Sequence, residues 1–283
     1  MSEFLLANEP TFRLAVFLGV LILMAIWEVA APRRRIEIPR VIRWTNNLGV
    51  VIVDTVLVRL VYPIAAVGLA LLAQQNGWGL FNLVTLPGWV AILVSIIFFD
   101  LAIYLQHVVF HKVPYLWRLH RMHHADTGID VTTGLRFHPL EILISMAIKF
   151  AVILVLGPPA VAVLLFEVIL NGMAMFNHSN IKLPFALDRA LRLIVVTPDM
   201  HRVHHSIDRV ETDSNYGFNL PWWDRLFGTY IDQPEKGHDG MTIGFAGFRT
   251  QRDHWLDRML IQPFSTPSKK DPKSIEAEAR SDV

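Results

Sequence analysis

The chain has 283 residues, of which 53% are hydrophobic and only 18% are charged, and its formal net charge is +1. A soluble domain normally carries about 25% charged residues, so the composition indicates a membrane protein, and the near-zero net charge argues against a nucleic-acid partner. The chain contains no cysteine, which excludes disulfides and a cysteine-ligated iron–sulfur cluster.

The first apolar stretch covers residues 12–31 and is interrupted only by Arg13 and Glu28. Its length matches the thickness of the hydrocarbon layer. The residues before it lack the basic start and the small-residue cleavage pattern of a removed signal peptide, so we expect a retained membrane helix. The loop that follows is predicted to be cytoplasmic, with the N-terminus outside, because it is rich in arginine: Arg33, Arg34, Arg35, Arg40 and Arg43.

A second span is predicted over residues 48–73. Isolated charges are costly inside a membrane, so Asp54 and Arg59 are expected to pair with each other or to line a cavity. Residues 74–88 contain no lysine or arginine, which suits the outside face, with Trp78 and Trp89 as interfacial anchors.

A third span begins near Trp89 and ends at the cytoplasmic boundary, where the first histidines occur. A further apolar run covers residues 140–176 and is interrupted by Gly157, Pro158 and Pro159. Proline ends helices, so this run predicts a helical hairpin that enters the membrane and returns to the same side.

Histidines are concentrated at the ends of these spans. His107 and His111 are four residues apart, and the pattern HxxHH occurs twice, as His120, His123 and His124 and as His201, His204 and His205. Residues with spacings of three and four lie on one face of a helix. Imidazole binds zinc, copper, iron and nickel well, and eight imidazoles exceed the three or four that one tetrahedral zinc uses. The sequence therefore predicts more than one metal ion.

The pattern argues against several other metal proteins. Soluble di-iron bundles use glutamates with paired ExxH motifs, whereas this chain has a single one, Glu235 with His238, in a polar region. Zinc hydrolases of the HExxH type need a glutamate where Val108 follows His107. A bis-histidine haem protein would place isolated histidines at mid-membrane. The non-enzymatic alternative is a histidine-lined metal carrier, which would need polar groups along a transmembrane path.

The motifs that contain these histidines occur in a characteristic order: HVVFH, LHRMHH, RFHPLE, NHSN, TPDMHRVHH, NYG and WDRLFGTY. In this combination the chain resembles the fatty acid hydroxylase superfamily, also called the sterol desaturase family, over residues 90–232. The resemblance implies an integral-membrane di-iron oxygenase that uses O2 to hydroxylate or desaturate a lipid, with electrons from cytochrome b5, ferredoxin or a reductase. The spacing of the motifs is compatible with both reactions.

The same resemblance implies the metal ligands, which are His107, His111, His120, His123, His124, His201, His204 and His205. His178 is a further implied ligand, as in the fatty acid 2-hydroxylases, although Ala174 stands where those enzymes have another histidine. His138 is a candidate replacement, with a structural hydrogen bond near Arg136 and Glu141 as the alternative. His238 and His254 lie outside the motifs and are expected at the surface.

The expected fold is all-α, a polytopic membrane helical bundle with a cytoplasmic, histidine-rich di-metal cap that holds two iron ions. The expected division of the chain is into N-terminal transmembrane helices (residues 1–88), a fatty acid hydroxylase domain (residues 89–232) and a polar C-terminal tail (residues 233–283). The last twenty residues have the composition of a disordered segment.

Overall fold

The computed structural model of the chain describes residues 2–267. Within this range every regular element is a helix, and pairing of the β type is limited to two isolated bridges, Pro32 with Ile181 and Ser206 with Ile243. The predicted all-α class is therefore confirmed.

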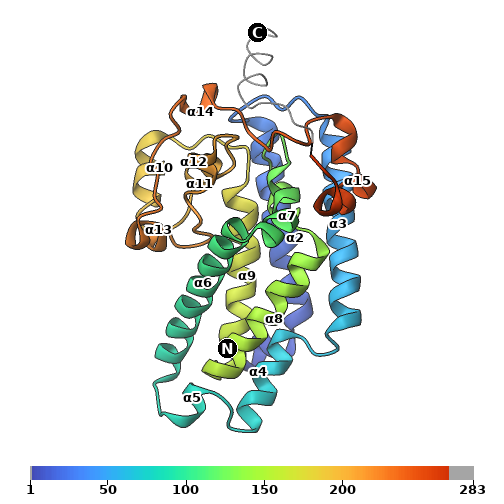
Figure 1. Ribbon diagram of the computed structural model, residues 1–283. Helices are drawn as coiled ribbons and strands as arrows, with labels where there is room; N and C mark the ends of the chain where they lie inside the picture. The colour runs from blue at the N-terminus through green and yellow to red at the C-terminus, as the bar shows by residue number, and fades with distance from the viewer. Residues whose placement is uncertain (1, 268–283) are drawn as a thin grey trace.

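In the described part of the chain, five segments are long and apolar enough to cross a membrane. They are α2 (Glu9–Ala30), the stretch that contains α3 (Arg40–Val61), α4 (Ala66–Gln75) and α5 (Leu80–Leu83), then α6 (Gly88–Lys112), α8 (Pro139–Leu156) and α9 (Ala160–Asn177). In Figure 1 these long helices form a bundle below a cap of short helices, and the N-terminus lies near the end of the bundle that is remote from the cap. The chain is an integral membrane protein of the multi-span type.

The second predicted span is not one continuous helix. α3 ends at Val61 and α4 begins at Ala66, because Pro63 lacks an N–H and its ring obstructs the preceding turn. The predicted pair of Asp54 and Arg59 is wrong for the described structure, in which Asp54 is buried without an ion-pair partner and Arg59 is exposed. A spacing of five residues turns the two side chains about 140° apart around a helix, so they do not meet.

α9 is the central helix of the bundle. In the apolar 18-residue stretch of α9, 56% is buried, compared with at most 28% of the corresponding stretch in each of the other four segments. Phe166 of α9 stacks on Phe99 of α6 with ring centroids 5.0 Å apart. This central position brings the end of α9, and His178 directly after it, into the middle of the cap.

The predicted break in the apolar run is confirmed, since α8 ends at Leu156 and α9 begins at Ala160. Gly157 caps α8 in the left-handed region, with φ of 61°. The chain just before α5 crosses this tip so closely that a Cβ atom on Gly79 would lie 2.2 Å from the Gly157 nitrogen. The tight contact between the two backbones accounts for both glycines.

The cap consists of short helices around the upper ends of the spans. They are α7 (Pro114–His124), η1 (Thr133–Leu135), α10 (Phe185–Leu191), α11 (Pro198–His204), α12 (Arg209–Thr212), α13 (Trp222–Phe227), α14 (Gly237–Gly240), η2 (Gln251–His254), α15 (Leu256–Ile261) and η3 (Gln262–Phe264); α1 (Ser2–Ala7) precedes the bundle. The cap thus draws on two separate parts of the chain, residues 114–135 and 185–264.

Residues 233–267, expected as part of a polar tail, pack on the cap. Arg121 of α7 donates to the carbonyls of Gln262 and Ser265, and Arg34 donates to the carbonyls of His238 and Met241. The remaining residues of the predicted tail, 268–283, lie outside the described part of the chain. The disorder expected for the last twenty residues stays a prediction.

The polar loop between α7 and α8 is buried rather than exposed. Arg43 of α3 is fully buried, and its Nη2 lies 2.9 Å from Asp126 and 3.0 Å from Asp130. Glu28 of α2 accepts the backbone N–H groups of Val131 and Asn180. These contacts hold η1 against α9, next to His178.

Candidate metal centre

Nine of the ten histidines predicted as ligands converge where the bundle meets the cap. They come from the end of α6, from α7, from the residue after α9 and from α11 with its C-cap. They form two clusters, in each of which one ring nitrogen per histidine lies within 4.8 Å of the corresponding nitrogens of the others. We name these the five-histidine group, His107, His111, His120, His124 and His204, and the four-histidine group, His123, His178, His201 and His205.

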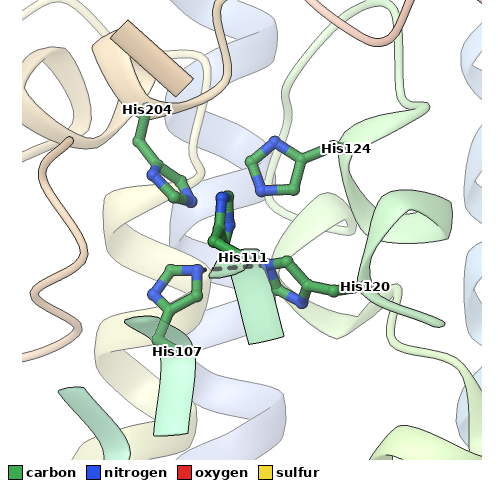
Figure 2. A group of neighbouring side chains, drawn as sticks. All are labelled: His107, His111, His120, His124 and His204. Carbon is green, nitrogen blue, oxygen red and sulfur yellow. Dashed lines mark hydrogen bonds between the residues drawn. The ribbon is translucent and has the colours of Figure 1, made fainter. Parts of the chain in front are cut away.

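Figure 2 shows the five-histidine group, whose rings point toward a common centre from three separate helices. Every histidine in both groups is at most 5% exposed. The Nε2 atoms of His107 and His120 face each other at 3.1 Å, as the dashed line in Figure 2 marks. The local spacing places the histidines of each helix on one face, and the packing of the helices brings these faces together, although His107 and His204 are about a hundred residues apart in the chain.

Hydrogen bonds at Nδ1 fix which ring nitrogen carries the proton in the five-histidine group. The Nδ1 atom of His107 lies 2.8 Å from the carbonyl oxygen of Tyr216, and that of His120 lies 2.7 Å from Glu141 Oε1. A carbonyl accepts only, so Nδ1 of His107 donates and its Nε2 keeps a free lone pair directed at the Nε2 of His120. A cation between these two Nε2 atoms would stabilise the arrangement.

The four-histidine group repeats this arrangement. His178 Nδ1 lies 2.7 Å from the carbonyl oxygen of Ala174, and His123 Nδ1 lies 3.3 Å from that of Arg136. The two Nε2 atoms are again 3.1 Å apart, and the Nε2 of His201 lies 3.0 Å from that of His178. The donor set of each group therefore fits a bound metal ion.

Burial keeps these rings neutral, which is the form that binds metal. It lowers the pKa of His120 to about 3 and that of His178 to about 4. Burial, together with neighbouring histidines, also lowers the pKa of His124 and His205 well below 6.5. Both ring nitrogens of these two residues are buried without a hydrogen-bond partner in the described structure. A buried polar nitrogen without a hydrogen bond lowers the stability of the fold, and coordination to a metal ion would give these nitrogens a partner.

In the described structure two carboxylates contact the histidine rings of the site, and both of them contact the five-histidine group. Glu141 pairs with His120, and Asp213 Oδ1 lies 3.3 Å from His111 Nδ1. Neither contact was predicted from the sequence. An available signal for Glu141 was its position in the first turn of an apolar membrane helix, where an acidic side chain is costly unless it has a partner.

Aromatic side chains close the site from the sides. Phe137 stacks on His123 with centroids 4.3 Å apart, and Phe218 lies against His178 and His201. Asp224 accepts the backbone N–H groups of Tyr216 and Gly217, so it supports the carbonyl to which His107 donates.

His138 lies outside both groups. Its Nδ1 accepts the backbone N–H of Leu140 at 3.2 Å, and its Nε2 lies 3.2 Å from the carbonyl oxygen of Leu260. His138 thus caps the first turn of α8 and fastens it to α15, so the geometry favours the structural alternative.

The expectation that His238 and His254 lie at the surface is wrong. His254 is fully buried, with its Nδ1 3.1 Å from Arg136 Nη1, and His238 is 7% exposed, with its Nε2 3.8 Å from Asp199 Oδ2. Residues 233–267 pack against the rest of the cap, and these two histidines are buried there although much of the segment is exposed to water.

The chain is similar to several known proteins. Residues 92–229 match the model of the fatty acid hydroxylase family. The chain is 30% identical to the ornithine lipid hydroxylase OlsE of Rhizobium tropici over 183 residues. These residues cover 64% of this chain and 52% of that protein. It is 29% identical over 190 residues to the alkylglycerol monooxygenase of Xenopus tropicalis, covering 62% of this chain and 40% of that protein.

A third relative is the cholesterol 25-hydroxylase-like protein of Danio rerio, 29% identical over 137 residues, which cover 47% of this chain and 53% of that protein. The chain therefore spans about half or less of the length of each of these relatives. No solved structure shows significant similarity to the chain.

Proposed function

We propose, from the match of residues 92–229 to the model of the fatty acid hydroxylase family, that this membrane protein is an O2-dependent lipid hydroxylase with two metal ions. The observation that carries the proposal is the pair of buried groups of neutral imidazoles at the cap end of a membrane bundle. The relatives are named as hydroxylases or monooxygenases of ornithine lipid, alkylglycerol and cholesterol, which supports a lipid substrate.

Iron is the metal that we propose for each group. Imidazole sites accept zinc, copper, iron and nickel, but zinc has no redox chemistry, whereas hydroxylation by O2 requires electron transfer. Bound iron would supply that redox chemistry. In the overall reaction one oxygen atom of O2 enters a C–H bond and the other leaves as water, with two electrons and two protons taken from outside.

The protein's own groups would orient the ligands and exclude water. The carbonyls of Tyr216, Ser214 and Ala174 hold the Nδ1 protons of His107, His204 and His178, so that each Nε2 faces the centre. The histidines are buried at the level where the spans meet the cap, so we propose that the lipid tail enters from the bilayer between helices.

An electron-transfer protein, a ferredoxin, cytochrome b5 or a reductase, is the proposed partner. The absence of cysteine supports this proposal, because the chain has no means of binding a cysteine-ligated iron–sulfur cluster. We place the cap on the cytoplasmic side on the strength of the arginines between α2 and α3. A reporter fused at residue 38 that proved to be outside would contradict this orientation.

Elemental analysis of the purified, detergent-solubilised protein tests the metal centre. Wild type from iron-replete cells should hold about two iron ions per chain, and His123→Ala combined with His204→Ala should lose both. The matched control is His138→Ala, which removes a buried histidine outside both groups and should keep the metal.

The lipids of the expressing cells test the reaction. Growth under isotopically labelled O2 should give a lipid with a labelled hydroxyl group in wild type, and the double variant should lack it. An unsaturated product without label would assign the protein as a desaturase. Zinc as the bound metal, without O2 consumption in the presence of a reductant, would contradict the proposed oxygenase.

A further inference from the structure

One side of the cap carries large apolar side chains that the described part of the chain leaves uncovered. Between 45% and 73% of each is exposed. They lie on α10, just after α10 and on α13, and we name them the α10–α13 patch: Phe185, Leu193, Ile194, Trp222, Leu226 and Phe227. Apolar side chains grouped in this way mark a surface that contacts something other than water.

The patch is one surface, because its two helices are tied together. Trp222 Nε1 donates to the carbonyl oxygen of Leu193 at 2.7 Å, and Arg225 donates to that of Arg192. Figure 1 shows α10 and α13 on the same side of the cap, with α13 nearer to the upper end of α6.

Contacts with α6 set the level of the patch relative to the membrane. Trp223 Nε1 donates to Asp100 at 2.8 Å, and the ring of Phe227 stacks on Tyr104 at 5.5 Å. Tyr104 lies about 12 Å along the axis before the end of α6 at Lys112. A span that starts at Gly88 crosses the hydrocarbon layer within about 20 residues, near His107. α13 therefore packs on α6 where that helix leaves the hydrocarbon.

The patch also continues the lipid-facing surface of α6. Trp89 and Leu93 of this span are 70% and 51% exposed, and they lie eleven and seven residues before Asp100, on the same face of the helix. Exposed Lys182, Arg189 and Arg225 lie on or next to the same cap segments. Aromatic and aliphatic side chains with a cationic rim are typical of helices that lie in a membrane interface.

We propose that α10 and α13 are immersed in the headgroup layer, with the α10–α13 patch against the acyl chains of the bilayer. The cap is then a partly embedded unit rather than one that stands clear in water. The bilayer is the occupant because the patch is continuous with a membrane span, so lipid that surrounds α6 reaches it without a second binding partner. This inference rests on the membrane bundle alone and is independent of the proposed reaction.

The absence of cysteine allows a direct test by spin labelling, since single cysteines can be introduced without the removal of any native one. Leu226→Cys and Phe185→Cys report on the patch. The control is Asp239→Cys on α14, whose native side chain is 81% exposed. Each labelled protein is reconstituted in vesicles of phosphatidylcholine and phosphatidylglycerol, and collisions with O2 and with a water-soluble nickel chelate are measured.

We expect the labels at 226 and 185 to collide with O2 several-fold more than with the chelate, because O2 concentrates in the bilayer, and the label at 239 to show the reverse. Chelate access at 226 and 185 equal to that at 239 would overturn the proposal. Shielding of the patch from both reagents would overturn it too, because that result identifies a covering protein. Variants that elute from a sizing column as wild type does exclude misfolding as the cause of either result.

Discussion

Glu141 is the residue whose single contact has the clearest consequence for the metal centre. Its Oε1 lies 2.7 Å from His120 Nδ1, and a carboxylate in this position raises the basicity of a ligating imidazole and fixes its orientation. Glu141→Gln keeps the size and removes the charge. We expect the affinity of the five-histidine group for metal to fall about 10–100-fold, measured as the metal retained in competition with a chelator.

Asp54→Asn is the matched control for this substitution. Asp54 is a buried acid of α3 that interacts electrostatically with Glu141, and the described structure shows it in contact with no histidine. This variant should retain metal as wild type does. Equal losses in both variants would show that the charge inside the bundle matters, rather than the contact with His120.

The two histidine groups should also release metal at different rates. Both carboxylates, Glu141 and Asp213, contact the five-histidine group, whereas His123 and His178 donate only to carbonyls. A chelator should therefore remove one metal ion per chain quickly and the other slowly. His205→Ala should lack the fast phase and keep the slow one. Loss of the slow phase in this variant would reverse the assignment.

At the residue scale, the sequence predicted the histidines better than their partners. His120, His123 and His124 lie within one helical turn, so their shared face follows from local spacing alone. Glu141 and Asp213 reach the rings from other elements, and such long-range contacts leave no local pattern. The burial of His254 was missed for the same reason.

At the scale of single elements, the loop between α7 and α8 depends on one arginine. Arg43 is buried between Asp126 and Asp130, and its removal would leave these carboxylates without their partner. We expect Arg43→Met to cost about 3–5 kcal/mol of stability, seen as a lower unfolding temperature in detergent. Arg35→Met, at an exposed position nearby, should change stability by less than about 0.5 kcal/mol. Similar shifts of the unfolding temperature in both variants would show that the buried contacts of Arg43 with Asp126 and Asp130 do not stabilise the loop.

The membrane spans could be predicted from composition, whereas the burial of polar segments could not, because it depends on tertiary contacts. The apolar runs and the Gly157 break follow from length and hydrophobicity, and the structure has spans at these places. The loop at residues 125–135 is polar yet almost entirely buried, and the segment 233–267, although much of it is exposed, buries single polar side chains such as His254 through contacts with distant residues. Composition indicates that a segment is polar, but only the tertiary contacts determine whether water surrounds it.

For the whole molecule, the candidate metal centre lies at the junction between the membrane bundle and the cap. The rings come from α6, α7, the end of α9 and α11, so the membrane bundle and both halves of the cap contribute to it. Without metal, several of these buried nitrogens lack a partner in the described structure, including Nε2 of His111 and of His204. Bound metal should therefore stabilise the junction between bundle and cap.

Removal of the metal should lower the unfolding temperature of the protein as a whole. A ligand that binds only the folded state stabilises it by about 2.7 kcal/mol when its free concentration is 100 times its Kd, so extraction with a chelator should remove at least that amount. The measurement is thermal unfolding in detergent before extraction, after extraction and after iron is restored, and restoration should recover the original temperature. The variant His123→Ala with His204→Ala should unfold at one temperature regardless of chelator, because its groups no longer hold metal. If the unfolding temperature of the wild-type protein did not change when the metal was extracted, the cap would be stabilised by its protein contacts alone.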